Sequence, residues 1–536
     1  MSEPVESLRA QLRERGYLSH GIERWFARDP WSSRTFWSEL GVVAFKAAAL
    51  IAVFASLAHT AVMLFRNGPL GAYETLILFS LYGAVWMALA AALVLALALA
   101  LKSRPEVPVD NPKVLLMISI GASGAIAAAF GLWWYAFDTP PSTIEIVAGV
   151  ALAGLLFLVA TVVVSAAILS FSIYELKRIP AIHQKPRTIP IAIAAAILIA
   201  LLFIPAYATG RREEPAPLQV VTRPSARRLA LIAADGLTFE LLRTRTALTR
   251  QFESVHATSA IRGASAAERW ASLGAGVPAS LHGVRSIAGV RLAASATVLQ
   301  SISRADWPLQ RIAPAAGLAR LEPLPPTVRR RDFAWEILAA RGVPSVAVNW
   351  WTSGEQQGAL TSIGQETIFA GARGDALRLD ALAERRFTAA VEQRQPQFAT
   401  VYLPALDVIL NRLTSDRSVE VAGVMQALGG FEATIARLSN AGYDIVLAGM
   451  PGEGQSGQAV VAATFPIAKP ATTFDVAPTI LDVLGFPSSN EMPGNSLAGT
   501  THEPRISSYG PHAAPAGTIK LNQEFYESLR SLGYIR

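Results

Sequence analysis

Asp235 is the residue at which the chemistry of this chain can begin. It follows Leu229–Ala234, a short apolar run typical of a strand buried on both faces, and it precedes Gly236. A turn there can present the carboxylate at the carboxyl end of the strand, before an amphipathic helix that Thr238 begins. Such a carboxylate can bind a hard metal ion through oxygen, and it can equally serve only to position the turn.

Nitrogen and sulfur ligands for a metal are scarce beyond Thr209. There is no cysteine, which excludes thiolate metal sites, disulfides and a cysteine nucleophile. The histidines beyond Thr209 are His256, His282, His502 and His512. His282 stands in a P-x-x-x-H-G segment, where a structural role is expected, so three imidazoles at one site would have to be those of His256, His502 and His512.

The composition indicates that part of the chain lies in lipid. The chain has 536 residues, of which 52% are hydrophobic, and a formal net charge of +7. Much of the basic charge flanks apolar segments, and no basic motif is interleaved with aromatic residues. We therefore expect membrane orientation, and no nucleic-acid partner, to explain the charge.

Five apolar stretches are long enough for a helix to cross the hydrocarbon layer. They are Leu40–Phe65, Glu74–Leu101, Val114–Phe137, Ile144–Ile173 and Ile189–Thr209. The leader and the second and fourth loops hold most of the positive charge, whereas the first loop has only Arg66 and the third has none. This asymmetry predicts a cytoplasmic amino terminus in a bacterial inner membrane. Five crossings would then place the rest of the chain in the periplasm or outside the cell.

The pattern predicts a five-span α-helical membrane domain followed by an α/β domain with a central, largely parallel sheet. Residues 1–39 are expected to form a cytoplasmic amphipathic leader, residues 40–209 the membrane domain and residues 210–228 a proline-rich tether. Residues 229–500 are expected to form the α/β domain, and residues 501–536 a tail with a closing helix. Further strands are predicted at Val343–Trp350, Phe398–Leu403, Tyr443–Ala448 and Val460–Phe465.

Three later segments share an order with a known family. They are Trp270–Val284 (WASLGAGVPASLHGV), Phe398–Asn411 (FATVYLPALDVILN) and Phe474–Leu497 (FDVAPTILDVLGFPSSNEMPGNSL). In this order, after the strand that ends at Asp235, they resemble the alkaline phosphatase superfamily. The nearest branch is the type I phosphodiesterase/nucleotide pyrophosphatase group, which is sulfatase-like.

The resemblance implies two divalent ions about 4 Å apart, which activate a serine or threonine nucleophile and stabilise the leaving oxygen. It assigns metal-ligand roles to Asp235 and Asp407, which are both present. The remaining ligand positions are substituted, because Asn411, Gly449 and Met450 stand where the family has histidine or aspartate. The nucleophile position falls on Ala266, and Ser265 is one residue away.

These departures predict a membrane-anchored pseudoenzyme with no metal cofactor. We expect a binding, regulatory or scaffold role at the outer face of the membrane, with a lipid headgroup, a glycan or an envelope protein as partner besides the bilayer. A bundle of membrane helices before such a domain is also similar to phosphoethanolamine transferases and lipoteichoic-acid synthases.

Two other functions stay open. The first is an active phosphodiesterase or phospho-group transferase on a lipid or glycan, with Ser265 as nucleophile and two Zn, Mn or Mg ions. An oxygen-only site built from Asp235, Asp407 and Glu453 would bind Mg²⁺ or Ca²⁺ weakly. The second is a structural subunit of a larger envelope complex.

Overall fold

The computed structural model describes residue 14 and residues 36–67, 70–137, 143–175, 220–353, 358–412, 417–499, 505–512 and 523–534, without the single positions 224, 264, 296 and 373. The chain divides into two compact units. The helical unit comprises Met1–Arg212 and Val290–Arg320, and the α/β unit comprises Glu213–Gly289 and Leu321–Arg536. Val290–Arg320, named the excursion here, thus leaves the stretch 229–500 and joins the helices.

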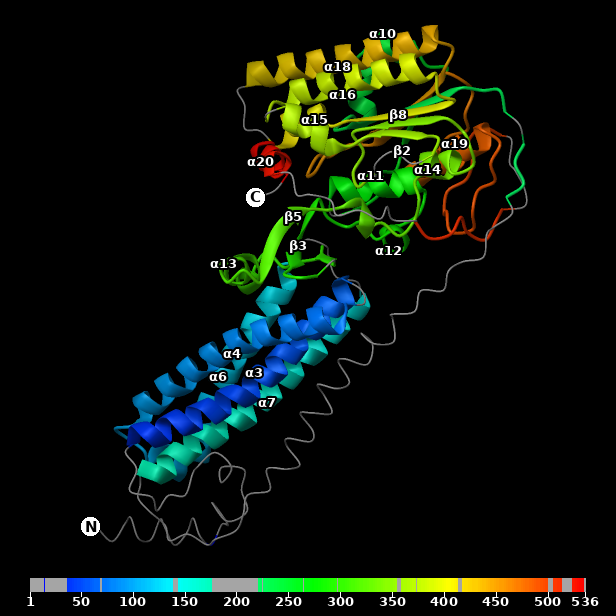
Figure 1. The fold of residues 1–536 in the computed structure, drawn as a ribbon. Helices are drawn as coiled ribbons and strands as arrows, with labels where there is room; N and C mark the ends of the chain where they lie inside the picture. The colour runs from blue at the N-terminus through cyan, green and yellow to red at the C-terminus, as the bar shows by residue number, and fades with distance from the viewer. Residues whose placement is uncertain are drawn as a thin grey trace. The chain divides into compact units, whose positions relative to one another are not determined.

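The helical unit is built on four long apolar helices (Figure 1). They are α3 (Phe36–Asn67), α4 (Ala72–Leu101), α6 (Pro112–Tyr135) and α7 (Thr143–Glu175), with the short α5 (Val107–Asp110) before α6. Within the described ranges, these four are long and apolar enough to cross a membrane. Four of the five predicted spans are therefore helices, and the fifth, Ile189–Thr209, lies outside the described residues.

Small residues allow these helices to pack closely. α3 packs against α4 and α7, and α6 packs against α7. The buried face of α3 carries Ala47, Ala48, Ile51 and Ala55, which are all fully buried. Alanine at such positions lets neighbouring backbones approach, which is how helices associate where lipid removes the hydrophobic driving force.

The α/β unit is built on a seven-stranded sheet in the order β2-β10-β9-β1-β8-β6-β7. β1 is the central strand and is parallel to β8 and β9, while β6 is parallel to β7 and β8. β10 is antiparallel to β9 and β2. The bounds are β1 (Leu229–Asp235), β2 (Ser254–Thr258), β6 (Ser345–Val348), β7 (Leu360–Ile363), β8 (Phe398–Leu403), β9 (Asp444–Met450) and β10 (Ala459–Ala463). The predicted fold class, with its largely parallel sheet, is confirmed.

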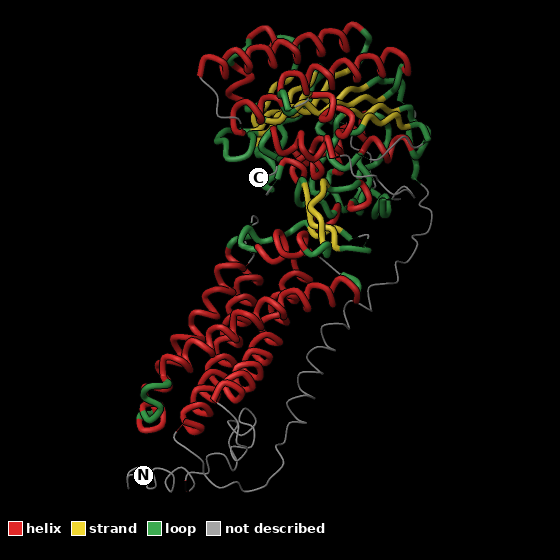
Figure 2. The backbone as a smooth tube through the Cα atoms, turned by 60° about the vertical axis from the view of Figure 1, so that its left-hand side comes forward, coloured by secondary structure: helices red, strands yellow, loops and turns green. Residues whose placement is uncertain are grey.

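Helices cover both faces of this sheet (Figures 1 and 2). One face carries α15 (Gln365–Ala372), α16 (Ala376–Arg394) and α18 (Arg417–Asn440), and the other carries α11 (Ala266–Ala275), α14 (Ala334–Ala339) and α19 (Val476–Val483). Shorter helical segments are α9 (Phe239–Arg243), α10 (Thr246–Thr249), α12 (Ala279–His282), η2 (Pro326–Val328), α17 (Ala405–Asp407), η3 (Val408–Arg412), η4 (Thr473–Asp475) and α20 (Gln523–Ser531). A separate three-stranded sheet, in the order β4-β3-β5, is formed by β3 (Ala288–Leu292), β4 (Val298–Leu299) and β5 (Ala319–Pro323).

Local sequence explains the start of the domain. Every residue of β1 is buried, as expected for an apolar run between two neighbouring strands. Thr238 caps α9, because its hydroxyl accepts a hydrogen bond from the Leu241 amide at 3.1 Å. The sequence did not indicate β2 (SVHAT) or β7 (LTSI), because neither edge strand is uniformly apolar.

Gly236 lets the turn after β1 approach α17. Its φ is +85°, and a Cβ there would lie 2.5 Å from the Asp407 amide nitrogen. Gly342 has nearly the same φ, +84°, but a Cβ there would meet no atom within 4 Å. Substitutions at these two glycines therefore distinguish two costs in free energy, that of a left-handed backbone and that of a steric overlap.

Replacing each of these glycines with alanine should reveal that difference. Gly342→Ala should lower the free energy of unfolding by about 1–2 kcal/mol, the usual cost of left-handed backbone. Gly236→Ala should lower it by about 1–3 kcal/mol more, because the added methyl overlaps α17. Thermal unfolding of the full chain in detergent measures both variants. Equal melting temperatures for the two would contradict the close approach.

Candidate functional site

Asp235 and Asp407 meet at the carboxyl edge of the central strands. Asp235 is the last residue of β1, and Asp407 follows the neighbouring parallel strand β8 by four residues. Both side chains are fully buried. Because Gly236 lies directly against the Asp407 backbone, the two carboxylates are neighbours, and each would repel the other if both were ionised.

Asp407 accepts hydrogen bonds from donors in the following helical segment η3 and in the loop after β9. The Arg412 Nε donates to Oδ2 at 2.7 Å, and the Asn411 Nδ2 donates to Oδ1 at 2.9 Å. The Glu453 amide also donates to Oδ1, at 3.1 Å. Both carboxylate oxygens of Asp407 thus accept hydrogen bonds from the protein. These bonds use lone pairs that a metal ion would need for coordination.

Arg412 is held as a cation in this position. Its side chain is 5% exposed, its Nη1 lies 3.1 Å from Glu453 Oε2, and its guanidinium lies 4.1 Å above the Tyr534 ring. Burial opposes the charged form of Arg412, but Tyr534, Asp407 and Glu453 outweigh it and raise its pKa above the ordinary value. The guanidinium therefore neutralises Asp407 from within the chain.

Asp235 has a second arginine beside it. The Tyr402 hydroxyl donates to Asp235 Oδ2 at 2.8 Å, and Arg269 Nη2 lies 3.8 Å from Oδ1. Arg269 is oriented by its other amino group, which donates to the Pro451 carbonyl at 2.7 Å. Burial, and then repulsion by Asp407, raise the pKa of Asp235 to about 6, although Arg269 and Tyr402 oppose this rise.

The substituted ligand positions of β9 are closed by backbone. A Cβ on Gly449 would lie 2.4 Å from the Leu237 carbonyl oxygen, so an aspartate cannot fit there without moving the turn after β1. Met450 is buried, and its carbonyl accepts a hydrogen bond from the Gly236 amide at 2.9 Å. A Cβ on Gly452 would lie 1.9 Å from Asp407 Oδ1, so the loop after β9 rests directly on that carboxylate.

Ser265 has a local structural role. It is the N-cap of α11, and its hydroxyl accepts a hydrogen bond from the Glu268 amide at 3.1 Å. The same hydroxyl donates to the Arg285 carbonyl at 3.1 Å. Ala266 is the first residue of the helix and is fully buried. The two candidate nucleophile positions are therefore a helix cap and a core methyl group.

The described histidines beyond Thr209 bond elsewhere. His256 Nε2 lies 3.2 Å from the Ile467 carbonyl, and His502 lies outside the described residues. His282 Nδ1 accepts from the Val284 amide, so its Nε2 carries the proton and donates to Ser272 at 2.8 Å. Burial, followed by Arg329 and Arg285, lowers the pKa of His282 to about 3, which keeps this ring neutral.

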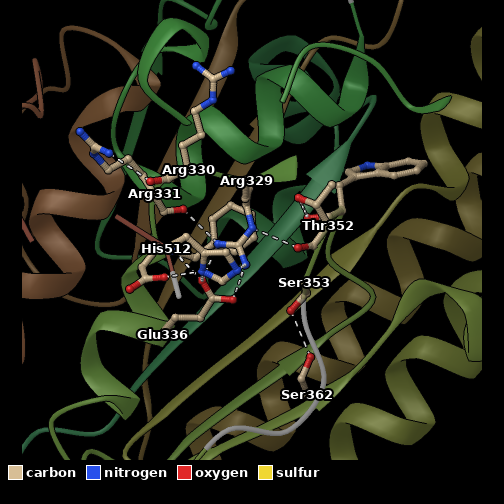
Figure 3. A network of polar contacts seen from close by, with 11 residues as sticks. Arg329, Arg330, Arg331, Glu336, Thr352, Ser353, Ser362 and His512 are labelled. Atoms are coloured by element: carbon tan, nitrogen blue, oxygen red, sulfur yellow. Dashed lines mark hydrogen bonds and ion pairs between the residues drawn. The ribbon is translucent and has the colours of Figure 1, made fainter. Parts of the chain in front are cut away.

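His512 belongs to a cluster that the sequence did not reveal (Figure 3). Asp332, Glu336 and His512 have ligand atoms within 4.8 Å of one another, the one such group among the residues described. His512 Nδ1 lies 2.5 Å from Asp332 Oδ1. However, Arg329 donates to both oxygens of Glu336 at 2.5 and 2.6 Å, and the Phe333 amide donates to one of them at 2.8 Å. A bidentate guanidinium thus already neutralises the buried carboxylate of this cluster.

The donor set does not fit two divalent ions. The family arrangement needs imidazoles and an additional aspartate, whereas this edge offers two carboxylates with arginines beside them. Sequence motifs located both aspartates but missed Arg269 and Arg412. The available signal was an arginine five residues after Asp407, next to the asparagine that replaces a ligand histidine.

The raised pKa of Asp235 predicts a pH-dependent stability. The native state holds this proton more tightly than the unfolded chain, so the group's contribution is present below about pH 4 and lost as pH rises through about 6. Asp235→Asn stays neutral, so its melting temperature relative to the unsubstituted protein should increase across this window. Thermal unfolding of both proteins between these pH values measures the difference, and a constant difference would contradict the assignment.

No family model and no curated protein matches this chain. Among solved structures, it is similar to phosphonoacetate hydrolase from Sinorhizobium meliloti 1021, at 12% identity and a TM-score of 0.30, over 44% of this chain and 60% of that one. It is similar to murine ectonucleotide pyrophosphatase/phosphodiesterase 5 at 11% identity and a TM-score of 0.30, over 42% and 56%.

A third similar structure is an integral membrane protein, lipooligosaccharide phosphoethanolamine transferase A from Neisseria meningitidis. The identity is 10% and the TM-score 0.30, over 82% of this chain and 95% of that one. The present chain spans only 60% of the hydrolase and 56% of the phosphodiesterase. In its own structure, the chain joins an α/β unit with a largely parallel sheet to four long apolar helices among the residues described.

Proposed function

We propose that this chain is a membrane-anchored binding or regulatory component whose α/β domain does not hydrolyse phosphate or sulfate esters. The observation that carries the proposal is the pairing of Asp407 with Arg412, at 2.7 Å, beside Arg269 and Asp235. A guanidinium supplies charge and hydrogen bonds but has no empty orbital for a substrate oxygen. It therefore cannot replace a metal as Lewis acid or lower the pKa of a nucleophilic hydroxyl by coordination.

The environment of Ser265 supports the same proposal. A nucleophilic serine needs a base or metal to take its proton, and its oxygen must be free to attack. The Ser265 hydroxyl instead bonds two backbone groups, the Arg285 carbonyl and the Glu268 amide. We propose that the domain binds a lipid headgroup, a glycan or an envelope protein through its surface.

Metal content and hydrolysis test this proposal together. The full chain, purified in detergent and incubated with Zn²⁺ or Mn²⁺, should retain no stoichiometric metal after desalting. Its hydrolysis of bis-p-nitrophenyl phosphate should equal that of Asp235→Ala and of Ser265→Ala. Retention of about two ions per chain, with hydrolysis that Asp235→Ala abolishes, would instead establish the metal-dependent enzyme.

We also propose that the α/β unit is extracytoplasmic in a bacterial inner membrane. The excursion contacts Asn67, Glu74 and Trp133, which lie at the ends of the helices next to the first and third loops. Those loops have little positive charge, which favours the outer side. Four spans with short connections return the chain to its starting side, so this orientation requires one more crossing. The predicted span Ile189–Thr209 would supply it.

Cysteine labelling in cells tests this orientation, because the chain has no cysteine of its own. Val421 in the α/β unit and Ser103 in the second loop are both exposed. A membrane-impermeant maleimide should label Val421→Cys in cells with a permeabilised outer membrane, and should label Ser103→Cys only after lysis. The reverse pattern would place the α/β unit in the cytoplasm.

A further inference from the structure

The excursion Val290–Arg320 is fixed to the ends of the membrane helices by polar contacts. Asn67 accepts hydrogen bonds from the Gln300 and Ser301 amides, both at 2.8 Å. The Ser295 hydroxyl donates to Glu74 at 2.5 Å, and the Arg304 amide donates to the Ala136 carbonyl at 2.9 Å. These contacts involve α3, α4 and the end of α6, so the excursion lies across one end of the bundle.

A buried carboxylate strengthens this attachment. Asp306 is fully buried, and its Oδ2 accepts a hydrogen bond from the Tyr82 hydroxyl of α4 at 2.6 Å. Its Oδ1 accepts from the Leu309 amide at 3.2 Å, which fixes the first turn of the following helical segment. That segment consists of the π-helical η1 (Pro308–Ile312) and α13 (Ala313–Ala315).

The inner face of the excursion is apolar. Its buried side chains belong to the same hydrophobic core as the membrane helices, and they are Val290, Leu292, Leu299, Leu309, Ala313 and Ala319. The excursion is therefore part of the helical unit. Its orientation relative to the four helices is fixed by the polar contacts and by this apolar packing together.

The outer face of the excursion, defined here by its exposed side chains, carries three apolar residues. Trp307 is 47% exposed, Ile312 38% and Leu318 41%. Exposed arginines stand among these side chains, at positions 304, 311 and 320. Tryptophan with arginine and aliphatic side chains is the composition of segments that lie at the boundary between lipid headgroups and acyl chains.

The position of this face identifies its partner. The excursion bonds to Trp133 and Ala136 at the end of α6, and that end also exposes Leu132 and Tyr135, at 70% and 78%. Those α6 side chains face lipid if α6 spans the membrane. The excursion is thus attached to the end of a helix that exposes apolar side chains, at the depth where such a helix leaves the hydrocarbon layer.

We infer that the excursion is an interfacial membrane-binding element. Trp307, Ile312 and Leu318 enter the outer part of the acyl-chain region, and the exposed Arg311 extends to the lipid phosphates. The α/β unit is then joined to the bilayer surface at a second place besides the chain that precedes it. This inference does not depend on whether the α/β unit is catalytic.

Spin labels at single introduced cysteines test it on the full chain, because the native sequence has none. Trp307→Cys and Leu318→Cys are labelled with a nitroxide and reconstituted into vesicles of phosphatidylethanolamine and phosphatidylglycerol. The control is Met425→Cys on α18, because Met425 is 47% exposed, like Trp307, but belongs to the α/β unit. Leu132→Cys is the control for a lipid-facing site.

The readout is relaxation of each label by oxygen, which partitions into lipid, compared with relaxation by a water-soluble nickel complex. The ratio of oxygen to nickel accessibility should be several-fold higher at positions 307 and 318 than at 425, and should approach the ratio at 132. A ratio at 307 and 318 equal to that at 425 would overturn the inference. Low accessibility to both reagents would also overturn it, because a protein partner would then cover this face. If Trp307→Cys does not elute as a monodisperse protein, Leu318→Cys decides.

Discussion

Two carboxylates buried side by side require compensating charge. This constraint determines which groups surround them at the edge of the sheet where β1 and β8 end. Asp235 and Asp407 are both fully buried. An unpaired buried ion costs several kcal/mol, so the native state must supply cations or keep a proton. Arg412 contacts Asp407 directly, whereas Arg269 lies farther from Asp235, and the pKa of Asp235 is raised to about 6, so that below this pH Asp235 keeps a proton.

The close backbone approach around this pair follows from the same constraint. A metal site needs a cavity that holds the ion and its substrate. An arginine that pairs with a carboxylate needs no such cavity. Gly236, Gly449 and Gly452 accordingly let the turn after β1 and the loop after β9 come within contact of α17 and each other. An aspartate at position 449 would require a further change in the turn after β1, because its Cβ would lie 2.4 Å from the Leu237 carbonyl oxygen.

The sequence could predict the features that depend on hydrophobic periodicity and on local signals such as helix caps and turns. The apolar run Leu229–Ala234, the cap at Thr238 and the alternation of strands and helices indicated the α/β class. Only the resemblance in the motifs assigned Asp235 and Asp407 to one site. The sequence could not predict the contact of Asp235 with Arg269, because Arg269 lies in the separate helix α11. The contact of Asp407 with Arg412 had a local signal, since the two residues are five positions apart. The sequence also could not predict that residues 290–320 belong with the helices, because the polar contacts that attach them join residues more than 160 positions apart.

Because Arg412 balances the charge of Asp407 from within the chain, the stability of the domain depends on different factors from that of a metalloenzyme. In a metalloenzyme the bound ions contribute RT ln(1 + [L]/Kd) to folding, so stability varies with metal supply. Arg412 belongs to the chain and is always present, so the charge balance at Asp407 does not vary with the medium. A domain whose role is to present a constant surface beside a membrane gains from that independence, whereas an enzyme that turns over phosphate esters loses its chemistry by it. The pairing of Asp407 with Arg412 thus fits the binding role proposed above.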